Sequence, residues 1–172
     1  MTEGLKLLFS QKEIVETVTR LAQQISIDYV DKKMVLIGVL KGAFVFLADL
    51  IRKLSIPAEI EFMRIASYGA GKESSGKIVV TKDVEISLAG KDALVIEDIV
   101  DTGLSLKFLV DHLRAYNPSS LKVCALVDKK ARREVEVQVD YVGFTIDDGF
   151  IVGYGIDFNE QYRTLPEIFV VE

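Results

Sequence analysis

The sequence has very few residues that bind metals through nitrogen or sulfur. Among its 172 residues there is one cysteine, Cys124, and one histidine, His112. One cysteine excludes an internal disulfide, and the two residues together are too few for a zinc site. Cys124 lies in the apolar run 123–127 and is expected to be a small buried side chain, which fits a reducing, cytoplasmic setting. His112 is expected on the surface of a helix, without a chemical role.

Long apolar runs and an excess of positive charge are also missing. No run approaches the roughly 20 apolar residues of a membrane-spanning helix, and the start Met1-Thr2-Glu3-Gly4 does not resemble a signal peptide. The net charge of −5 argues against a nucleic-acid backbone as the main partner, but not against small phosphorylated ligands. The spacings of a Walker loop and of a Gly-x-Gly-x-x-Gly dinucleotide fingerprint are both absent. These absences disfavour common nucleotide-binding classes.

The apolar pattern instead predicts alternating strands and helices. Ser10 and Glu13 form the pattern of a capping box, followed by apolar residues at helical spacing over 11–28. Further helices are predicted over about 42–54 and 103–116, and strands over 34–40, 59–65, 78–84, 93–96, 121–127, 141–146 and 150–155. This order predicts a single α/β domain over 1–172, with a mainly parallel central sheet flanked by helices. The glycine- and serine-rich stretch 66–77 is predicted to be a flexible lid loop.

The most informative segment runs from Leu94 to Ser105. Here an apolar strand is followed by Glu97 and Asp98, and then by Asp101 before a Thr-Gly turn at a helix start. Free amides at that start, with the hydroxyls of Thr102 and Ser105, would form a phosphate cradle, and Gly103 would let the backbone approach closely. Carboxylates beside phosphate are compatible if the ligand also carries hydroxyls and a metal. The alternative is that the acids only solubilise a strand end and cap the next helix.

The segment resembles the phosphoribosyl pyrophosphate (PRPP) motif of the type I phosphoribosyltransferases. Further matches to the hypoxanthine-guanine (6-oxopurine) branch follow in the right order: Leu40-Lys41-Gly42-Ala43, Ser67-Tyr68, Val127-Asp128-Lys129 and the run from Phe150 to Arg163. The resemblance covers nearly all of the chain from Val35 onward. It implies the type I phosphoribosyltransferase fold, with a small hood built from the N-terminal and C-terminal segments. It also implies purine salvage, in which PRPP and hypoxanthine or guanine give IMP or GMP with Mg²⁺.

The resemblance assigns roles to individual residues. PRPP and its phosphates would be bound by Leu40, Lys41, Gly42, Glu97, Asp98, Asp101, Thr102, Gly103, Leu104 and Ser105. The purine would be bound by Lys129, Phe150, Ile151 and Asp157, and magnesium by Glu97, Asp98 and Asp157. Asp101 would share the proton of purine N7, and Arg163 would hold the pyrophosphate as the second catalytic residue. Ser67 and Tyr68 would belong to the lid, and the Leu40–Lys41 peptide bond would be cis.

Several alternatives stay open at this stage. Lys129 begins a stretch of basic residues that is also typical of a solvated loop, and Phe150 is also compatible with a core strand residue. Arg163 is equally compatible with a surface ion pair. The same fold could accept xanthine or adenine, or serve as a regulatory module that binds PRPP without catalysis. A flavodoxin-like nucleotide binder is the third class. Homodimers or homotetramers are implied by the resemblance alone.

Overall fold

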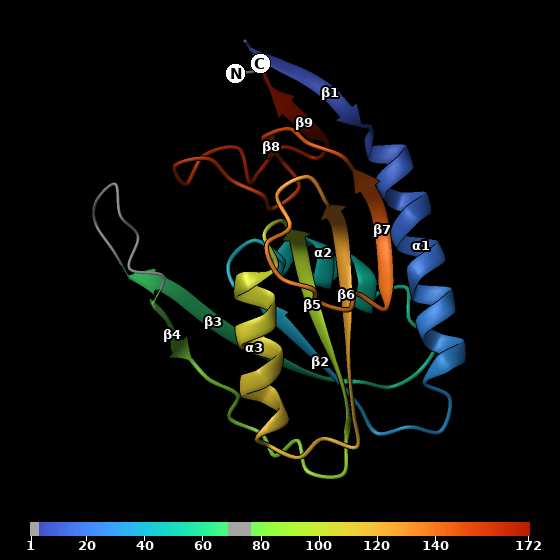
Figure 1. Ribbon diagram of the computed structural model, residues 1–172. Helices are drawn as coiled ribbons and strands as arrows, with labels where there is room; N and C mark the ends of the chain where they lie inside the picture. The colour runs from blue at the N-terminus through green and yellow to red at the C-terminus, as the bar shows by residue number, and fades with distance from the viewer. Residues whose placement is uncertain (1–3, 69–76) are drawn as a thin grey trace.

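The computed structural model describes residues 4–68 and 77–172, which form a six-stranded and a three-stranded sheet with three helices (Figure 1). The strands of the large sheet are β2 (Met34–Val39), β3 (Glu59–Tyr68), β4 (Lys77–Lys82), β5 (Asp92–Val100), β6 (Ser120–Lys129) and β7 (Tyr141–Ile146). Helix α2 (Phe44–Ile51) follows β2 in the chain, and helix α3 (Leu104–Arg114) follows β5. The spatial order of the strands is β4-β3-β2-β5-β6-β7, with β4 antiparallel to β3 and the other neighbours parallel. The predicted mainly parallel α/β fold is confirmed.

Helices cover both faces of the central sheet. Helix α1 (Gln11–Asp28) begins at the predicted capping box, in which Ser10 and Glu13 exchange hydrogen bonds, and its bounds match the prediction. Leu94 and Ile96 of β5 pack with the buried faces of α1 and α2, whereas Ala93 and Val95 pack with α3. This alternation places one core on each side of the sheet, and Figure 1 shows α3 in front of the sheet and α2 behind it. Cys124 is buried in the first core, as predicted.

A small antiparallel sheet lies beyond the ends of the central strands. It consists of β1 (Leu5–Phe9), β9 (Ile168–Val171) and β8 (Ile151–Val152), in that order. Figure 1 shows β5, β6 and β7 running toward it, so the carboxyl edge of the central sheet faces the small sheet. Ligands of open parallel sheets bind at this edge.

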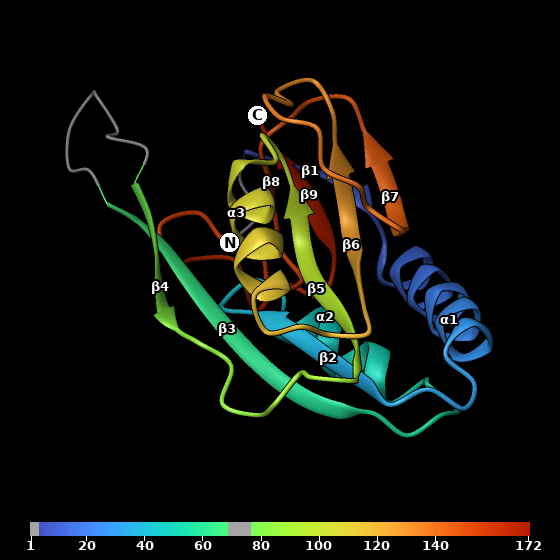
Figure 2. The same ribbon diagram turned by 60° about the horizontal axis from the view of Figure 1, so that its bottom comes forward.

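Several predicted bounds were wrong. β3 continues through Ala66, Ser67 and Tyr68, where Ser67 pairs with Ile78 and Tyr68 with Lys77. Main-chain pairing with β4 therefore overrides the polar composition, and the predicted lid loop is shorter than 66–77. Figure 2 shows β3 and β4 extending together from the side of the sheet. The rest of the predicted lid, residues 69–76, lies outside the described part of the chain.

Two other bounds differ near the predicted site. β5 does not end at Ile96 but continues to Val100, because Glu97 still pairs with Ala125 of β6. The predicted strand 150–155 is reduced to Ile151–Val152, since residues 153–155 turn with positive φ angles of 103°, 52° and 93°. Helices α2 and α3 each end a few residues before the predicted positions. Within the described residues, no helix is long and apolar enough to cross a membrane.

Candidate active site

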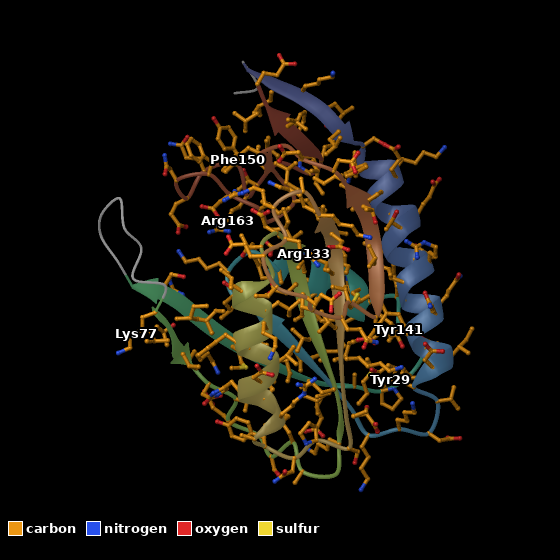
Figure 3. The ribbon with its side chains drawn as sticks, in the orientation of Figure 1. Tyr29, Lys77, Arg133, Tyr141, Phe150 and Arg163 are labelled. Atoms are coloured by element: carbon orange, nitrogen blue, oxygen red, sulfur yellow. The ribbon has the colours of Figure 1, made fainter. Side chains whose placement is uncertain are left out.

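The predicted site residues lie at the carboxyl edge of the central sheet. They come from the ends of β2, β5 and β6, from the loop between β5 and α3, and from the segment 148–163. Figure 3 shows Arg133, Arg163 and Phe150 around the region between the ends of β5 and β6 and the small sheet, whereas Tyr29 and Tyr141 lie at the opposite end of the molecule. The side-chain contacts in this region define the site.

The loop after β5 forms one wall of a pocket of about 260 Å³. Gly103 adopts a φ of +85°, a conformation that favours glycine, and the Thr102 hydroxyl accepts a hydrogen bond from Leu104 N–H at 3.4 Å. Helix α3 therefore begins with its amides close to the pocket. The lining residues are Val39, Ile65, Glu97, Ile99, Val100, Asp101, Thr102, Gly103, Ser105 and Leu106. The predicted phosphate cradle thus coincides with a pocket, while Leu104 itself is exposed.

Glu97, which is buried, and Asp98, which is half-buried, form a pair of adjacent acids next to this pocket. Burial, with the neighbouring charge of Asp98, raises the pKa of Glu97 well above its ordinary value. Burial also raises the pKa of Asp98, although Ile99 N–H donates to its carboxylate at 2.9 Å. The ionised forms of these two adjacent acids are therefore disfavoured. A bound cation or several hydrogen-bond donors would stabilise them.

The turn after β2 lies directly against Asp98. The Leu40–Lys41 peptide bond is cis, as the resemblance implied. A Cβ atom at Gly42 would overlap the Asp98 carboxylate, and one at Gly155 would come within 2.5 Å of the Gly42 carbonyl oxygen. Glycine at 42 is therefore required by this close approach of backbone and carboxylate.

Asp101 is surrounded by positive charge. Lys129 Nζ lies 3.7 Å from Oδ1, and Arg132 Nη1 donates to Oδ2 at 3.3 Å. Oδ1 is buried without a hydrogen-bond partner among the described residues. A buried acceptor of this kind is expected to take a donor when a ligand enters.

Lys129 is the last residue of β6 and is only 5% exposed, so the alternative of a solvated basic loop is wrong for this residue. Its ammonium also donates to the Gly149 carbonyl at 3.0 Å and lies 3.6 Å from Asp148. The lysine therefore links the end of β5 with the residue that precedes Phe150.

Phe150 is 50% exposed, so the alternative of a core residue is wrong. Its ring meets that of Phe158 edge to face, with centroids 5.2 Å apart. The Ile151 side chain is buried, and its backbone pairs with Val170 of β9. The small sheet thus holds an exposed aromatic ring beside the carboxyl edge, where a planar ligand could stack.

Arg163 is mostly buried, with 17% of its side chain exposed, and it pairs with two carboxylates. Its Nη2 atom lies 3.0 Å from Asp157 and 3.3 Å from Glu160, and Nη1 donates to the Gly155 carbonyl at 2.8 Å. An ion pair is therefore present, as the alternative supposed, but it is not on the open surface. Arg163 is also close enough to oppose the raised pKa of Asp98.

The acids predicted to bind a metal are only partly brought together. Glu97 and Asp98 are adjacent, whereas Asp157 is held by Arg163. Over residues 4–68 and 77–172, no three side chains of the metal-binding types converge. Magnesium commonly takes one or two carboxylates and completes its shell with water and substrate phosphates. The pair Glu97–Asp98 fits that requirement.

Arg133 contacts the main chain of two predicted site residues, which the sequence did not indicate. Its Nε donates to the Asp101 carbonyl at 3.0 Å, and its Nη2 contacts the Lys129 carbonyl at 3.2 Å and the buried Asp128. The Thr102 carbonyl also accepts from Glu134 N–H at 2.9 Å. These bonds tie the segment after β6 to the phosphate loop. In the sequence Arg133 was part of a basic run, which carries no signal for such a position.

His112 lies on helix α3 with 29% of its side chain exposed, and it makes a contact that the sequence did not indicate. Its Nε2 atom lies 2.9 Å from Asp83, and the same carboxylate accepts from the Tyr116 hydroxyl at 2.6 Å. These contacts join α3 to the segment that follows β4. The sequence offered no signal for this pairing, because the partners lie in different elements.

Comparisons with known proteins agree with the geometry. The model of the phosphoribosyl transferase domain matches residues 5–159. The hypoxanthine-guanine phosphoribosyltransferase of Dictyostelium discoideum is 50% identical, covering 94% of this chain and 92% of the relative. That of Aquifex aeolicus is 45% identical, covering 98% and 95%. The crystal structure of a hypoxanthine phosphoribosyltransferase from Staphylococcus aureus superposes with a TM-score of 0.94 at 38% identity, covering 99% of this chain and 93% of that one. The chain therefore belongs to the hypoxanthine-guanine phosphoribosyltransferase family.

Proposed function

We propose that this chain transfers the 5-phosphoribosyl group of PRPP to N9 of hypoxanthine or guanine, giving IMP or GMP and pyrophosphate. The observation that carries the proposal is the contact between Asp101 and Lys129 beside the phosphate pocket. It places a potential base and a cationic donor at the junction between the proposed PRPP and purine positions. Membership of the family makes the chain a transferase.

The 5-phosphate of PRPP is proposed to bind at the loop after β5. The amides that begin α3 and the hydroxyls of Thr102 and Ser105 border the pocket there. Such amides favour an anion because they lack partners within the helix and carry the positive end of its dipole. Gly103 allows the phosphate to approach the backbone.

Glu97 and Asp98 are proposed to bind the ribose hydroxyls and Mg²⁺. Their raised pKa values mean that the ionised form of each acid is disfavoured. Hydroxyl donors or a divalent cation would stabilise the ionised forms. Magnesium bound there would neutralise charge on the diphosphate leaving group. Asp157 would join the set only after releasing Arg163.

The transfer itself breaks the bond between ribose C1 and the diphosphate oxygen and forms the bond from C1 to purine N9. Asp101 is proposed to take or share the proton of purine N7 during this exchange. Its negative charge would also stabilise the cation-like sugar. Displacement of Lys129 toward the purine would free Oδ1 of Asp101 for this role, since that atom has no other partner in the described residues.

Base selection is assigned to Lys129 and Phe150. An ammonium has only donors, so it complements a carbonyl oxygen at purine C6 and mismatches the amino group of adenine. Phe150 offers an exposed ring for stacking, and the backbone of Ile151 is proposed to read the purine edge. Xanthine shares the C6 carbonyl, so this donor does not exclude it.

A spectrophotometric assay tests the function. Purified protein with PRPP and magnesium is offered hypoxanthine, guanine, xanthine and adenine separately. Nucleotide formed from hypoxanthine or guanine, and lost when EDTA removes the metal, is the expected result. If PRPP binds but no base reacts, the proposal is wrong and a regulatory PRPP-binding module replaces it. We also propose a homodimer or homotetramer, which light scattering coupled to size-exclusion chromatography measures.

A further inference from the structure

A tight turn after Asp157 presents a carboxylate to the site. Phe158 and Gln161 exchange backbone hydrogen bonds of 3.2 Å and 3.0 Å around Asn159 and Glu160, whose φ angles are +51° and +61°. Glu160 N–H also donates to Asp157 at 2.8 Å. Asparagine tolerates positive φ better than other side chains, whereas glutamate rarely adopts it. The turn therefore holds Glu160 in a conformation that its own backbone preference does not explain.

One oxygen of Glu160 connects two cations. Its Oε2 atom lies 3.0 Å from Lys41 Nζ and 3.3 Å from Arg163 Nη2. Lys41 follows β2 and Arg163 follows the turn, so the carboxylate joins the two sides of the site. The hydrogen bond from Lys41, followed by that from Arg163, lowers the pKa of Glu160, so it carries its charge at neutral pH. Two cations converging on one anionic oxygen is also the arrangement that a phosphate oxygen requires.

We propose that Glu160 is an internal anion that occupies the pyrophosphate seat formed by Lys41 and Arg163, and that the diphosphate must displace it. This inference rests on the proposed function and on the family resemblance, which implies that Lys41 and Arg163 bind the diphosphate of PRPP. Glu160 then sets the affinity for PRPP and for the pyrophosphate product, and it is not itself a catalytic residue.

The charges explain why displacement is feasible. The Glu160 side chain is 64% exposed and that of Lys41 is 47% exposed, so their ion pair is partly screened by water. A diphosphate carries several negative charges and can contact both cations with different oxygens, whereas Glu160 offers one oxygen to both. A diphosphate can thus displace the Glu160 carboxylate, whereas weaker anions cannot. When Glu160 binds Lys41 and Arg163 again, it would assist release of pyrophosphate.

Binding of inorganic pyrophosphate tests the inference without turnover. Titration calorimetry in the presence of magnesium would compare the wild-type chain with Glu160→Gln and with Glu16→Gln. Glu16 is a matched control, because its side chain is 65% exposed and its only ion pair within the described part of the chain is with Lys12 at 4.0 Å on α1. The expected result is affinity about threefold to tenfold tighter for Glu160→Gln, as loss of exposed ion pairs predicts, and unchanged for Glu16→Gln.

Unchanged or weaker pyrophosphate affinity in Glu160→Gln would overturn the inference while leaving the proposed function intact. Wild-type protein that binds no pyrophosphate would overturn the proposed function and the inference with it. Glu160→Asn is the second variant, because asparagine suits the positive φ and removes the contact with both cations. It should also tighten binding. In the assay, both variants should lower the KM for PRPP and lower kcat if pyrophosphate release limits turnover, which loss of structure alone would not produce.

Discussion

The ammonium of Lys129 lies 3.7 Å from Oδ1 of Asp101, although Lys129 ends β6 and Asp101 directly follows β5. Parallel pairing of β5 with β6 brings these strand ends together. The residue proposed to read purine O6 and the residue proposed to accept the proton therefore interact directly with each other. A change at one of them is expected to affect the other, so variants need separate readouts for base selection and for rate.

Lys129→Ala should reduce discrimination among purine bases. Without the ammonium, no cationic donor favours a C6 carbonyl over an amino group, so the ratio of kcat/KM for hypoxanthine to that for adenine should fall about tenfold or more. Steady-state kinetics with each base measure this ratio. Lys130→Ala is the control, because Lys130 is exposed and 4.0 Å from Asp128. An unchanged ratio in Lys129→Ala would remove Lys129 from base recognition.

Asp101→Asn should lower kcat by about a hundredfold or more while PRPP affinity changes little, because an amide cannot accept the purine proton. Single-turnover kinetics and PRPP titration separate the two effects. Asp111→Asn on α3 is a control with its carboxylate 46% exposed and paired with Arg114 at 3.1 Å. Full activity of Asp101→Asn would contradict its role as the base.

Gly42→Ala should lower the affinity for PRPP more than it lowers the stability of the fold. The added methyl group would overlap the Asp98 carboxylate, so either Asp98 or the turn after β2 must move. We expect the KM for PRPP to rise about tenfold, in line with the cost of overpacking a tight contact. Gly90→Ala is the comparison, since Gly90 has a φ of +72° but open space around it. If both variants bind PRPP equally well, the Gly42–Asp98 contact has no role in binding.

Phe150→Ala should weaken binding of the purine and leave binding of PRPP unchanged. Stacking of a base on an aromatic ring is worth about 1–3 kcal/mol, so the KM for hypoxanthine should rise about tenfold. Leu7→Ala on β1 controls for loss of an apolar side chain, because Leu7 and Phe150 are both 50% exposed. A normal KM for hypoxanthine would exclude stacking on Phe150.

Asp83 should make stability depend on pH in the acid range. Burial of its carboxyl acts to raise the pKa, but hydrogen bonds from Tyr116 and His112 outweigh it and hold the pKa below the ordinary value of 3.8. A lowered folded-state pKa gives stability that is present above the unfolded value and lost as pH falls through the folded one. Urea unfolding should show wild type more stable than Asp83→Asn at pH 7, with the gap closing below about pH 4. A gap independent of pH would contradict this.

The sequence predicted those parts of the fold that depend on local pattern. The bounds of α1 followed from the capping box and the spacing of apolar residues such as Ile14 and Val18. The mainly parallel character of the central sheet followed from the alternation of strands and helices along the chain. The extension of β5 through Glu97 was not predictable, because the acids interrupt the apolar pattern while pairing with β6 continues. The same applies to Ser67 in β3.

The sequence indicated candidate site residues where residue types cluster along the chain, as from Glu97 to Ser105, and where family resemblance extended that cluster. It did not indicate contacts between residues that are distant in sequence. Arg133 and Glu160 are ordinary charged residues in polar segments, and only the folded chain shows that one binds the Asp101 carbonyl and the other joins Lys41 to Arg163. Burial of Lys129 likewise depends on its position at the end of a central strand, which charge patterning cannot reveal.

The pairing of the small sheet determines when it can form during synthesis of the chain. β8 carries the residue after Phe150 and pairs with β9, and β9 pairs with β1, with Leu5 opposite Val171. Strand β1 precedes the central strands in the chain and its partner β9 follows them, so β1 can pair only after the central strands have been synthesised. The central sheet can form earlier, since its pairings span shorter segments. The proposed purine side of the site is therefore expected to form after the proposed phosphate loop.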